Sequence, residues 1–502
     1  MTEELYGRCG TITSEQDKAL YSAFKAKDSR FDGRFFVGVT STGIYCRPIC
    51  GARLPKEENC VYYHTAAEAE KAGFRPCLIC RPELAPGMAI TDAKSMLAKR
   101  AAKYIEENCG NSTSLHELAS KLGYTDRHLR RVFNEEYHVA PVEYSNTFRL
   151  LLAKSLLTDT DLNVVDVAMA AGFGSLRRFN DLFKMQYRLS PTGFRKQAKN
   201  RKAKDVCITV ALGYRPPYQW DRILHFLSQR AIPGVEIIIN NEYLRTVKLY
   251  DKLGEAKCGW IKIGNRREKN VLSVTFSENL LCVLPKLLGR IRDLFDLYCN
   301  PHAVGETLIS MDTVKPGAFV AGLRVPGCFD PFELCVRAVL GQQITVKAAG
   351  TLAGKMAAVY GTPIETGIEG LHTLFPSPND ILSLEGKIEE HLGQLGIVAS
   401  RSRAILALAH FLLENQFDFE LCLNPEDVIK KLTKIPGIGP WTAKYIAMRA
   451  LKWADAILET DLGIKKALGG MHEKEILKLS EQWKPWRSYA MMALWDSLIT
   501  QR

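Results

Sequence analysis

The chain has 502 residues, of which 46% are hydrophobic and 24% are charged, a composition that predicts several folded domains and excludes a disordered protein. No run of about 18 apolar residues occurs, and the N-terminal sequence MTEELYGRCG is polar, so the sequence predicts neither a membrane span nor a signal peptide. The formal net charge is +12, and residues 1–204 supply most of it, with 32 Lys and Arg against 23 Asp and Glu. This excess indicates a polyanionic partner.

Four of the 14 cysteines form two close pairs, Cys46 and Cys50 in GIYCRPICGAR and Cys77 and Cys80 in GFRPCLICRP. We expect a cytoplasmic protein, in which thiols stay reduced, so these residues are not predicted to form a disulfide framework. The pattern C-x3-C, 26 residues, C-x2-C is typical of a tetrahedral four-thiolate zinc site. The sequence therefore predicts Zn²⁺ as a cofactor. A purely structural zinc site and two unrelated buried thiol pairs are the alternatives.

The segments STGIYCRPIC and GFRPCLIC resemble the N-terminal zinc domain of the Ada family over roughly residues 12–85. The resemblance implies that all four cysteines bind zinc and that Cys46 irreversibly accepts a methyl group from a DNA methylphosphotriester. Methylation would remove one negative charge from the cluster and raise its affinity for DNA. Phosphate contacts are expected from side chains in or beside these motifs, unless they are merely solvated: Thr42, Arg47, Arg53 and Arg75. Cys60 is interpreted as a core thiol.

Two predicted helix-turn-helix units follow a helix at 92–110, for which Asp92 is the expected cap and Gly110 the expected end. In each unit a glycine supplies the bend, Gly123 in the first and Gly172 in the second. Thr125 or Asp126 caps the second helix of the first unit. The outward side chains predicted on the two recognition helices are Arg127, His128, Arg130, Arg131, Arg177 and Arg178.

The repeat, joined by a long helix over VEYSNTFRLLLAKSLLTD, resembles the AraC-type DNA-binding domain. One position of AGFGSLRRFNDLFKMQYRLSPTGFR departs from the family pattern: Arg188 stands where the family has a glycine before the Ser-Pro pair. The resemblance implies that each recognition helix enters the major groove on successive turns of DNA. Arginines there would read guanine edges or hold phosphates. A basic linker at 196–205 separates this region from the C-terminal half.

Residues 205–310 mix predicted strands, VCITVAL and VLSVTFS, with predicted helices, and the chain is helical from about 329 onward. In LTKIPGIGPWTAKYIAMRA, Gly437 and Gly439 precede a helix that begins at Trp441. Backbone N–H groups at such a helix start can bind a DNA phosphate. This segment resembles the helix–hairpin–helix DNA glycosylases, and Asp461 stands where that superfamily has its catalytic carboxylate.

Other segments narrow the resemblance to the AlkA-type 3-methyladenine glycosylases over residues 205 to about 496: AGLRVPGCFDPFELCVRAVLGQQITV and WKPWRSYAMMALW among them. It implies that Asp461 stabilises the sugar cation formed as the N-glycosidic bond breaks. The flipped base would stack on Trp441, Tyr445 and Trp495, unless these rings are only core packing. The wedge position, usually apolar in that family, is Gln343.

Three sequence features of related proteins are absent from this chain, and each narrows the predicted function. Pro440 and Trp441 occupy the place of the Schiff-base lysine of bifunctional relatives, so hydrolysis without strand cleavage is expected, and Lys444 is interpreted as a phosphate contact. Cys422 is the last cysteine, so no C-terminal iron–sulfur centre is expected. The Pro-Cys-His-Arg sequence of the partner module usual in the Ada family does not occur.

The predicted fold is multidomain α+β. The expected domains are 1–88, a zinc methyl-acceptor domain; 92–199, an all-α double helix-turn-helix domain; 205–318, a TATA-binding-protein-like α+β subdomain; and 319–502, a helix–hairpin–helix glycosylase domain. The predicted function is stoichiometric methyl transfer that switches a transcription activator, fused to a DNA-3-methyladenine glycosylase II. The alternatives are a glycosylase whose N-terminal half only targets DNA, and a regulator whose glycosylase half is inactive. Expected partners are double-stranded alkylated and operator DNA and RNA polymerase, for a monomer at the bacterial nucleoid.

Overall fold

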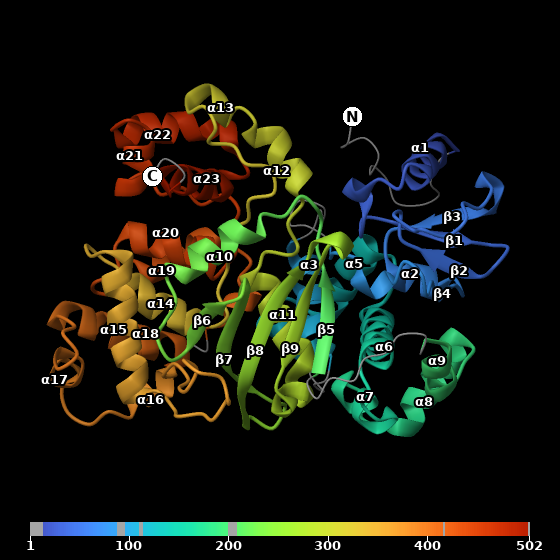
Figure 1. Cartoon of the computed structure of the whole chain (residues 1–502), viewed down its shortest axis with the longest axis horizontal. Helices are drawn as coiled ribbons and strands as arrows, with labels where there is room; N and C mark the ends of the chain where they lie inside the picture. The colour runs from blue at the N-terminus through green and yellow to red at the C-terminus, as the bar shows by residue number, and fades with distance from the viewer. Residues whose placement is uncertain (1–13, 88–95, 110–113, 199–207, 415–416, 500–502) are drawn as a thin grey trace. The chain divides into compact units, whose positions relative to one another are not determined.

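The computed structural model describes residues 14–87, 96–109, 114–198, 208–414 and 417–499 (Figure 1). The chain divides into two compact units. The first comprises residues 1–215, 250–255 and 266–289, and the second comprises 216–249, 256–265 and 290–502. Both predicted N-terminal domains fall within the first unit. The four predicted domain boundaries stay predictions, and Asp92 and Gly110 lie outside the described residues.

The first unit begins with a small four-stranded sheet of order β3-β1-β2-β4. Its strands are β1 (Phe36–Val39), β2 (Ile44–Cys46), β3 (Cys60–Tyr63) and β4 (Arg75–Pro76), accompanied by helices α1 (Ser14–Lys25) and α2 (Ala66–Lys71). Strand β1 is antiparallel to both β2 and β3, whereas β4 runs parallel to β2. The parallel pair matters for function because it aligns the chain just before Cys77 with the chain that ends at Cys46.

Seven helices then form the predicted double helix-turn-helix region: α3 (Met96–Glu107), α4 (Leu115–Lys121), α5 (Asp126–Tyr137), α6 (Pro141–Asp159), α7 (Val164–Ala170), α8 (Leu176–Tyr187) and α9 (Pro191–Ala198). The predicted bends are present, since Gly123 and Gly172 take φ of +79° and +86° between the paired helices. Of the two candidate caps, Thr125 is the one used, and its hydroxyl accepts the His128 N–H. The long predicted connecting helix is α6.

The five-stranded sheet of the C-terminal half has the order β5-β9-β8-β7-β6. Its strands are β5 (Ile208–Gly213), β6 (Glu236–Ile239), β7 (Glu242–Tyr250), β8 (Ala256–Arg266) and β9 (Val271–Phe276). Within the first unit β5 pairs antiparallel with β9, and within the second unit β6 pairs antiparallel with β7. Strands β5 and β9 cover the two sequence segments predicted to be strands.

The second unit is mainly helical. Its helices, with α11 spanning the division between the units, are α10 (Trp220–Ser228), α11 (Leu284–Leu294), α12 (Pro301–Leu308), α13 (Met311–Val314), α14 (Pro331–Leu340), α15 (Val346–Tyr360), α16 (Pro378–Leu382), α17 (Ile388–Gly393), α18 (Ala399–Glu414), α19 (Pro425–Leu432), α20 (Pro440–Arg449), α21 (Leu462–Ala467), α22 (Glu473–Ser480) and α23 (Arg487–Ile499). Short 3₁₀ helices elsewhere in the chain are η2 (Ser29–Phe31), η3 (Glu57–Asn59), η4 (Pro82–Leu84), η5 (Arg267–Lys269), η6 (Glu278–Val283), η7 (Phe419–Leu421) and η8 (Glu481–Trp483).

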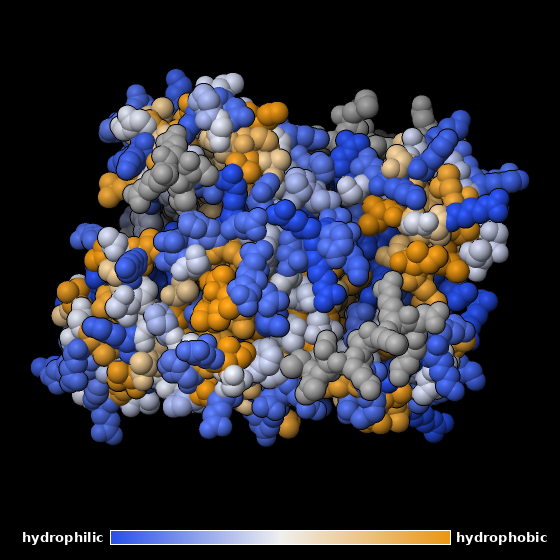
Figure 2. All heavy atoms as spheres, viewed as in Figure 1, coloured by the Kyte–Doolittle hydropathy of each residue, from blue (hydrophilic) through white to orange (hydrophobic). Residues whose placement is uncertain are grey.

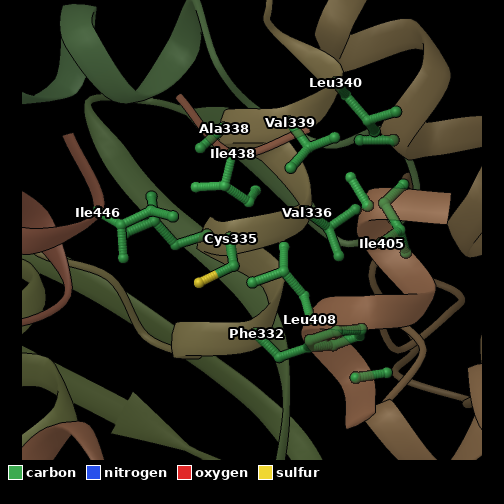
Figure 3. Close-up of a cluster of buried hydrophobic side chains, with 14 of the residues drawn as sticks. Phe332, Cys335, Val336, Ala338, Val339, Leu340, Ile405, Leu408, Ile438 and Ile446 are labelled. Carbon is green, nitrogen blue, oxygen red and sulfur yellow. The ribbon is translucent and has the colours of Figure 1, made fainter. Parts of the chain in front are cut away.

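The core of the second unit lies around α14. Figure 3 shows Phe332, Val336 and Val339 of α14 beside Ile405 and Leu408 of α18, all of them buried. Ile438, in the turn before α20, and Ile446, within α20, belong to the same cluster, so burial of apolar surface holds the predicted hairpin in place.

The described residues contain no helix that is both long and apolar enough to cross a membrane. On the face drawn in Figure 2, hydrophobic side chains lie in patches among hydrophilic ones.

Candidate functional site

The four predicted cysteines come together in one cluster. The sulfurs of Cys46, Cys50, Cys77 and Cys80 all lie within 4.8 Å of one another. The Cys77 N–H donates to the Tyr45 carbonyl at 3.0 Å, which places β2 and β4 side by side, and a turn closed by Cys50 N–H brings the second cysteine of the first pair back. Four sulfur donors at this separation fit a tetrahedral zinc ion.

The sulfurs differ in the backbone donors around them. Those with a donor are Cys80, from Arg47 N–H at 3.3 Å; Cys77, from Ile79 N–H at 3.4 Å; and Cys50, from Ala52 N–H. These contacts fit thiolates, since N–H groups stabilise the charged form. Within the described residues, no backbone N–H donates to Cys46, whose side chain is buried next to the other three.

The phosphate contact predicted for Arg47 needs correction. The Arg47 side chain is buried, its Nε donates to Asp32 Oδ1 at 2.8 Å and its Nη1 donates to the Cys80 carbonyl at 3.0 Å. A guanidinium occupied in this way braces the cysteine turn and is not available to DNA. Arg53 and Thr42 are exposed, so their phosphate contacts stay predictions.

Cys60 stands outside the cluster, as expected. It packs against the same small core as the four ligands, and its sulfur donates to the Lys56 carbonyl at 3.4 Å. Burial raises the pKa of the Cys60 thiol to about 11, so it stays protonated at neutral pH.

The predicted recognition helices α5 and α8 each bury an aromatic face. Phe133 and Tyr137 of α5 and Phe183 and Tyr187 of α8 lie inside. The basic side chains predicted to face DNA are exposed except for His128, which is partly buried: Arg127, His128, Arg130, Arg131, Arg177 and Arg178. The burial pattern agrees with the predicted orientation, and the DNA contacts themselves stay predictions.

Asp461 is the centre of the second site. It caps α21 by accepting the Ile464 N–H at 2.9 Å. Its Oδ2 accepts the indole N–H of Trp441 at 3.0 Å, and its Oδ1 accepts that of Trp495 at 2.9 Å. Trp441 stacks on Tyr445, with ring centroids 5.3 Å apart and planes 8° apart. The three predicted rings and the predicted carboxylate thus converge, although nothing in the sequence pattern indicated that both indoles would orient the carboxylate.

The hairpin before α20 has the predicted form. Gly437 has φ of +89°, and Gly439 is the residue that caps α20. Gln343, at the expected wedge position, is exposed and has φ of +57°. The Lys444 Nζ donates to both carboxylate oxygens of Glu459 at 2.5 and 2.7 Å, and the phosphate contact of Lys444 stays a prediction.

Sequence reasoning missed the arginine that contacts the Tyr445 hydroxyl. Arg449, one turn after Tyr445 on α20, donates from Nη1 to the Tyr445 hydroxyl at 2.8 Å. Burial opposes ionisation of the phenol, but the positive charges of Arg449 and Arg230 outweigh it and lower the pKa of Tyr445 to about 8. The i, i+4 spacing on one helix is the only signal that could have suggested this pair.

Comparison with known proteins identifies the domains of the chain. Three family descriptions match the chain: metal binding domain of Ada over residues 19–83, helix-turn-helix domain over 118–197, and AlkA N-terminal domain over 209–330. A Mycobacterium tuberculosis protein named "probable bifunctional transcriptional activator/DNA repair enzyme AlkA" is 34% identical over 95% of this chain and 96% of its own length. The chain belongs to this family of bifunctional transcriptional activator/DNA repair enzymes.

Two further relatives each match a different part of this chain. DNA-3-methyladenine glycosylase 2 of Escherichia coli is 34% identical over 57% of this chain and 95% of its own length. The bifunctional transcriptional activator/DNA repair enzyme AdaA of Bacillus subtilis is 31% identical over 38% of this chain and 85% of its own length. The predicted fusion of an Ada-type zinc domain, a helix-turn-helix domain and an AlkA-type glycosylase is confirmed.

Proposed function

We propose that Cys46 takes a methyl group from a methylphosphotriester in DNA. The sulfur attacks the methyl carbon, an S–C bond forms, and the O–CH₃ bond breaks with its electron pair left on the phosphate oxygen. The product is a thioether and a restored phosphodiester, so each protein molecule reacts once. Zinc, when bound, keeps the four sulfurs deprotonated.

The choice of Cys46 among the four cysteines is supported by its surroundings as well as by family resemblance. A hydrogen bond to a thiolate stabilises it and weakens it as a nucleophile. Since Cys46 is the member of the cluster that receives no backbone N–H from the described residues, its sulfur is the strongest nucleophile of the four.

Methylation couples repair to regulation through charge. It removes one negative charge from a zinc cluster that faces a polyanion, which strengthens DNA binding. Helices α5 and α8 then hold operator DNA in the major groove through their exposed arginines. Two recognition helices in one chain remove the need for a dimer, and an activator at a promoter contacts RNA polymerase. The protein therefore works as a monomer at the nucleoid.

The C-terminal half removes alkylated purines such as 3-methyladenine. The base is flipped out of the duplex, its place is filled by Gln343, and it stacks against Trp441, Tyr445 and Trp495. As the N-glycosidic bond breaks, its electron pair neutralises the cationic base, and the sugar cation forms beside the Asp461 carboxylate. Water then adds to the sugar and releases a proton, leaving an abasic site and an intact strand.

The observation that supports the glycosylase function is the pair of indole donors on Asp461, because they orient both carboxylate oxygens beside the aromatic rings. The backbone N–H groups of Gly437 and Gly439, just before α20, supply a phosphate contact.

One preparation of zinc-loaded protein tests both halves. It is incubated with DNA treated with a methylating agent, and the released bases and the protein peptides are then analysed by mass spectrometry. We expect free 3-methyladenine in the supernatant and one added methyl on the Cys46 peptide, with neither product from untreated DNA. A methyl on another cysteine, or on none, rejects the first half, and the absence of released base rejects the second.

A further inference from the structure

The Tyr445 hydroxyl accepts a hydrogen bond from Arg449 and lies in the positive field of Arg230. Arg449 is buried, and besides its bond to Tyr445 it donates from Nε to the Pro326 carbonyl at 2.8 Å and from Nη2 to the Gly327 carbonyl at 2.7 Å. Its guanidinium is therefore fixed by the backbone and presents Nη1 to the phenol.

A second arginine reaches the same place from the end of α10. The Arg230 guanidinium lies 3.7 Å from the centroid of Phe226, and that of Arg449 lies 5.0 Å from it, so one ring packs against both. Arg230 also interacts with the Tyr445 hydroxyl. Within the described residues, neither arginine forms an ion pair with a carboxylate.

The charged groups around Tyr445 leave a positive excess. On α14, Arg337 faces it too, but that arginine is paired with Glu236 of β6 and with Glu333. Arg245 of β7 is also paired with both of these glutamates, and Tyr243 of β7 lies next to them. Asp461 hydrogen-bonds the Trp441 and Trp495 rings that neighbour Tyr445. Arg230 and Arg449 thus lack a counter-ion, and the phenol is the group placed to supply one.

We infer that Tyr445 acts as a phenolate in the base pocket, held by Arg449 and Arg230, and that its charge favours the cationic alkylated base. An anionic Tyr445 ring stacked on Trp441 raises the electron density of the aromatic faces that the base contacts. A cation is attracted to an electron-rich face, so this interaction favours binding of an alkylated, positively charged base over a neutral one. Tyr445 is the specificity-determining residue here, and the two arginines position it. The inference rests on the proposed glycosylase function.

Ionisation of Tyr445 is measured directly as the ultraviolet tyrosinate absorbance of the full chain, titrated for wild type and for Tyr445→Phe. We expect the difference between the two titrations to show a single midpoint near pH 8, because the pKa of Tyr445 is about 8. Arg230→Gln moves that midpoint upward, toward the value of a free tyrosine at about 10. Two control variants should leave the midpoint unchanged. Arg222→Gln alters an arginine of α10 that is paired with Asp496, and Tyr360→Phe removes a hydroxyl that donates to the His391 carbonyl, away from Tyr445.

The consequence for the substrate is measured as single-turnover release of 3-methyladenine from methylated DNA. The wild-type rate divided by the Tyr445→Phe rate should rise about three- to tenfold between about pH 7 and pH 9, and the rise should move to higher pH in Arg230→Gln.

A midpoint near 8 with a pH-independent rate ratio overturns the inference while the glycosylase function stands. A pH-dependent ratio with no titration of Tyr445 overturns it too, since another group would then be responsible. Failure of wild type to release any base rejects the glycosylase function itself, whatever the absorbance shows.

Discussion

The carboxylate to which we assign the glycosylase chemistry, Asp461, also has a role in the fold. It caps α21 and it receives the two indole N–H groups. Asn is as good a helix cap as Asp, but it carries no negative charge to stabilise a sugar cation. We therefore predict that Asp461→Asn folds normally and releases 3-methyladenine at least about 100-fold more slowly, measured under single-turnover conditions.

The matched control for this variant is Asp330→Asn. Asp330 caps α14 by accepting the Glu333 N–H at 2.8 Å, so it has the structural role of Asp461 without the indole contacts. Base release should stay within about twofold of wild type. Equal losses in the two variants would mean that capping, and not the charge of Asp461, sustains the reaction.

Arg47 and Asp32 are predicted to set the zinc affinity. The pair is buried, and Arg47 also holds the Cys80 carbonyl and donates its own N–H to the Cys80 sulfur. Residues that orient metal ligands typically contribute about 10- to 100-fold to metal affinity. Arg47→Ala should weaken zinc binding by that factor in a competition with a chromophoric chelator. The exposed Arg53→Ala should not change it, and a full-affinity Arg47→Ala protein would contradict the role.

At the scale of elements, the hairpin before α20 depends on Gly437. Its φ is +89°, and a Cβ there would lie 2.9 Å from the Ala404 Cβ of α18, whereas a Cβ at Gly439 meets nothing within 4 Å. Gly437→Ala should therefore lower the free energy of unfolding by roughly 1–3 kcal/mol and weaken binding to undamaged duplex DNA. Gly439→Ala is the control for stability. Equal melting temperatures for the two variants would contradict the argument.

Local pattern was enough to predict the elements that hold these sites. Glycines between apolar helices predicted both bends, and the two cysteine spacings predicted one cluster. Contacts between distant segments had no such signal. Asp32 is 15 residues from Arg47 with no motif to join them, and Arg230 approaches Tyr445 from more than 200 residues away. The fold brings these groups together, so sequence reasoning left Arg47 at the surface and overlooked Arg449.

At the scale of the whole chain, the first unit joins the zinc module to the helix-turn-helix module through buried charges. Arg81, beside the last zinc ligand, is paired with Asp159 at the end of α6 at 2.6 Å. Glu83 is paired with Lys154 of α6 as well as with Arg81, and both Glu83 and Lys154 are nearly inaccessible. Buried pairs of this kind fix one arrangement, because either partner alone would be an uncompensated charge.

Glu70 should make the stability of this unit depend on pH. It is buried on α2, accepts the Tyr45 hydroxyl at 3.1 Å, and burial raises its pKa to about 8. The folded chain therefore keeps a proton on Glu70 that the unfolded chain releases above its ordinary value of 4.5. The unfolded state then binds fewer protons, so the free energy of unfolding falls as pH rises toward about 8 and levels off above it.

Glu70→Gln removes this dependence because its amide oxygen still accepts the Tyr45 hydroxyl but cannot ionise. Denaturant unfolding of zinc-loaded protein between about pH 6 and pH 9 should show wild type losing stability relative to Glu70→Gln as pH rises. Comparing the two proteins at each pH cancels the contribution of the zinc thiolates, which both retain. The exposed Glu58→Gln should follow wild type throughout. A constant difference between wild type and Glu70→Gln would mean that Glu70 is already ionised in the folded chain, with a positive group such as Lys154 neutralising it.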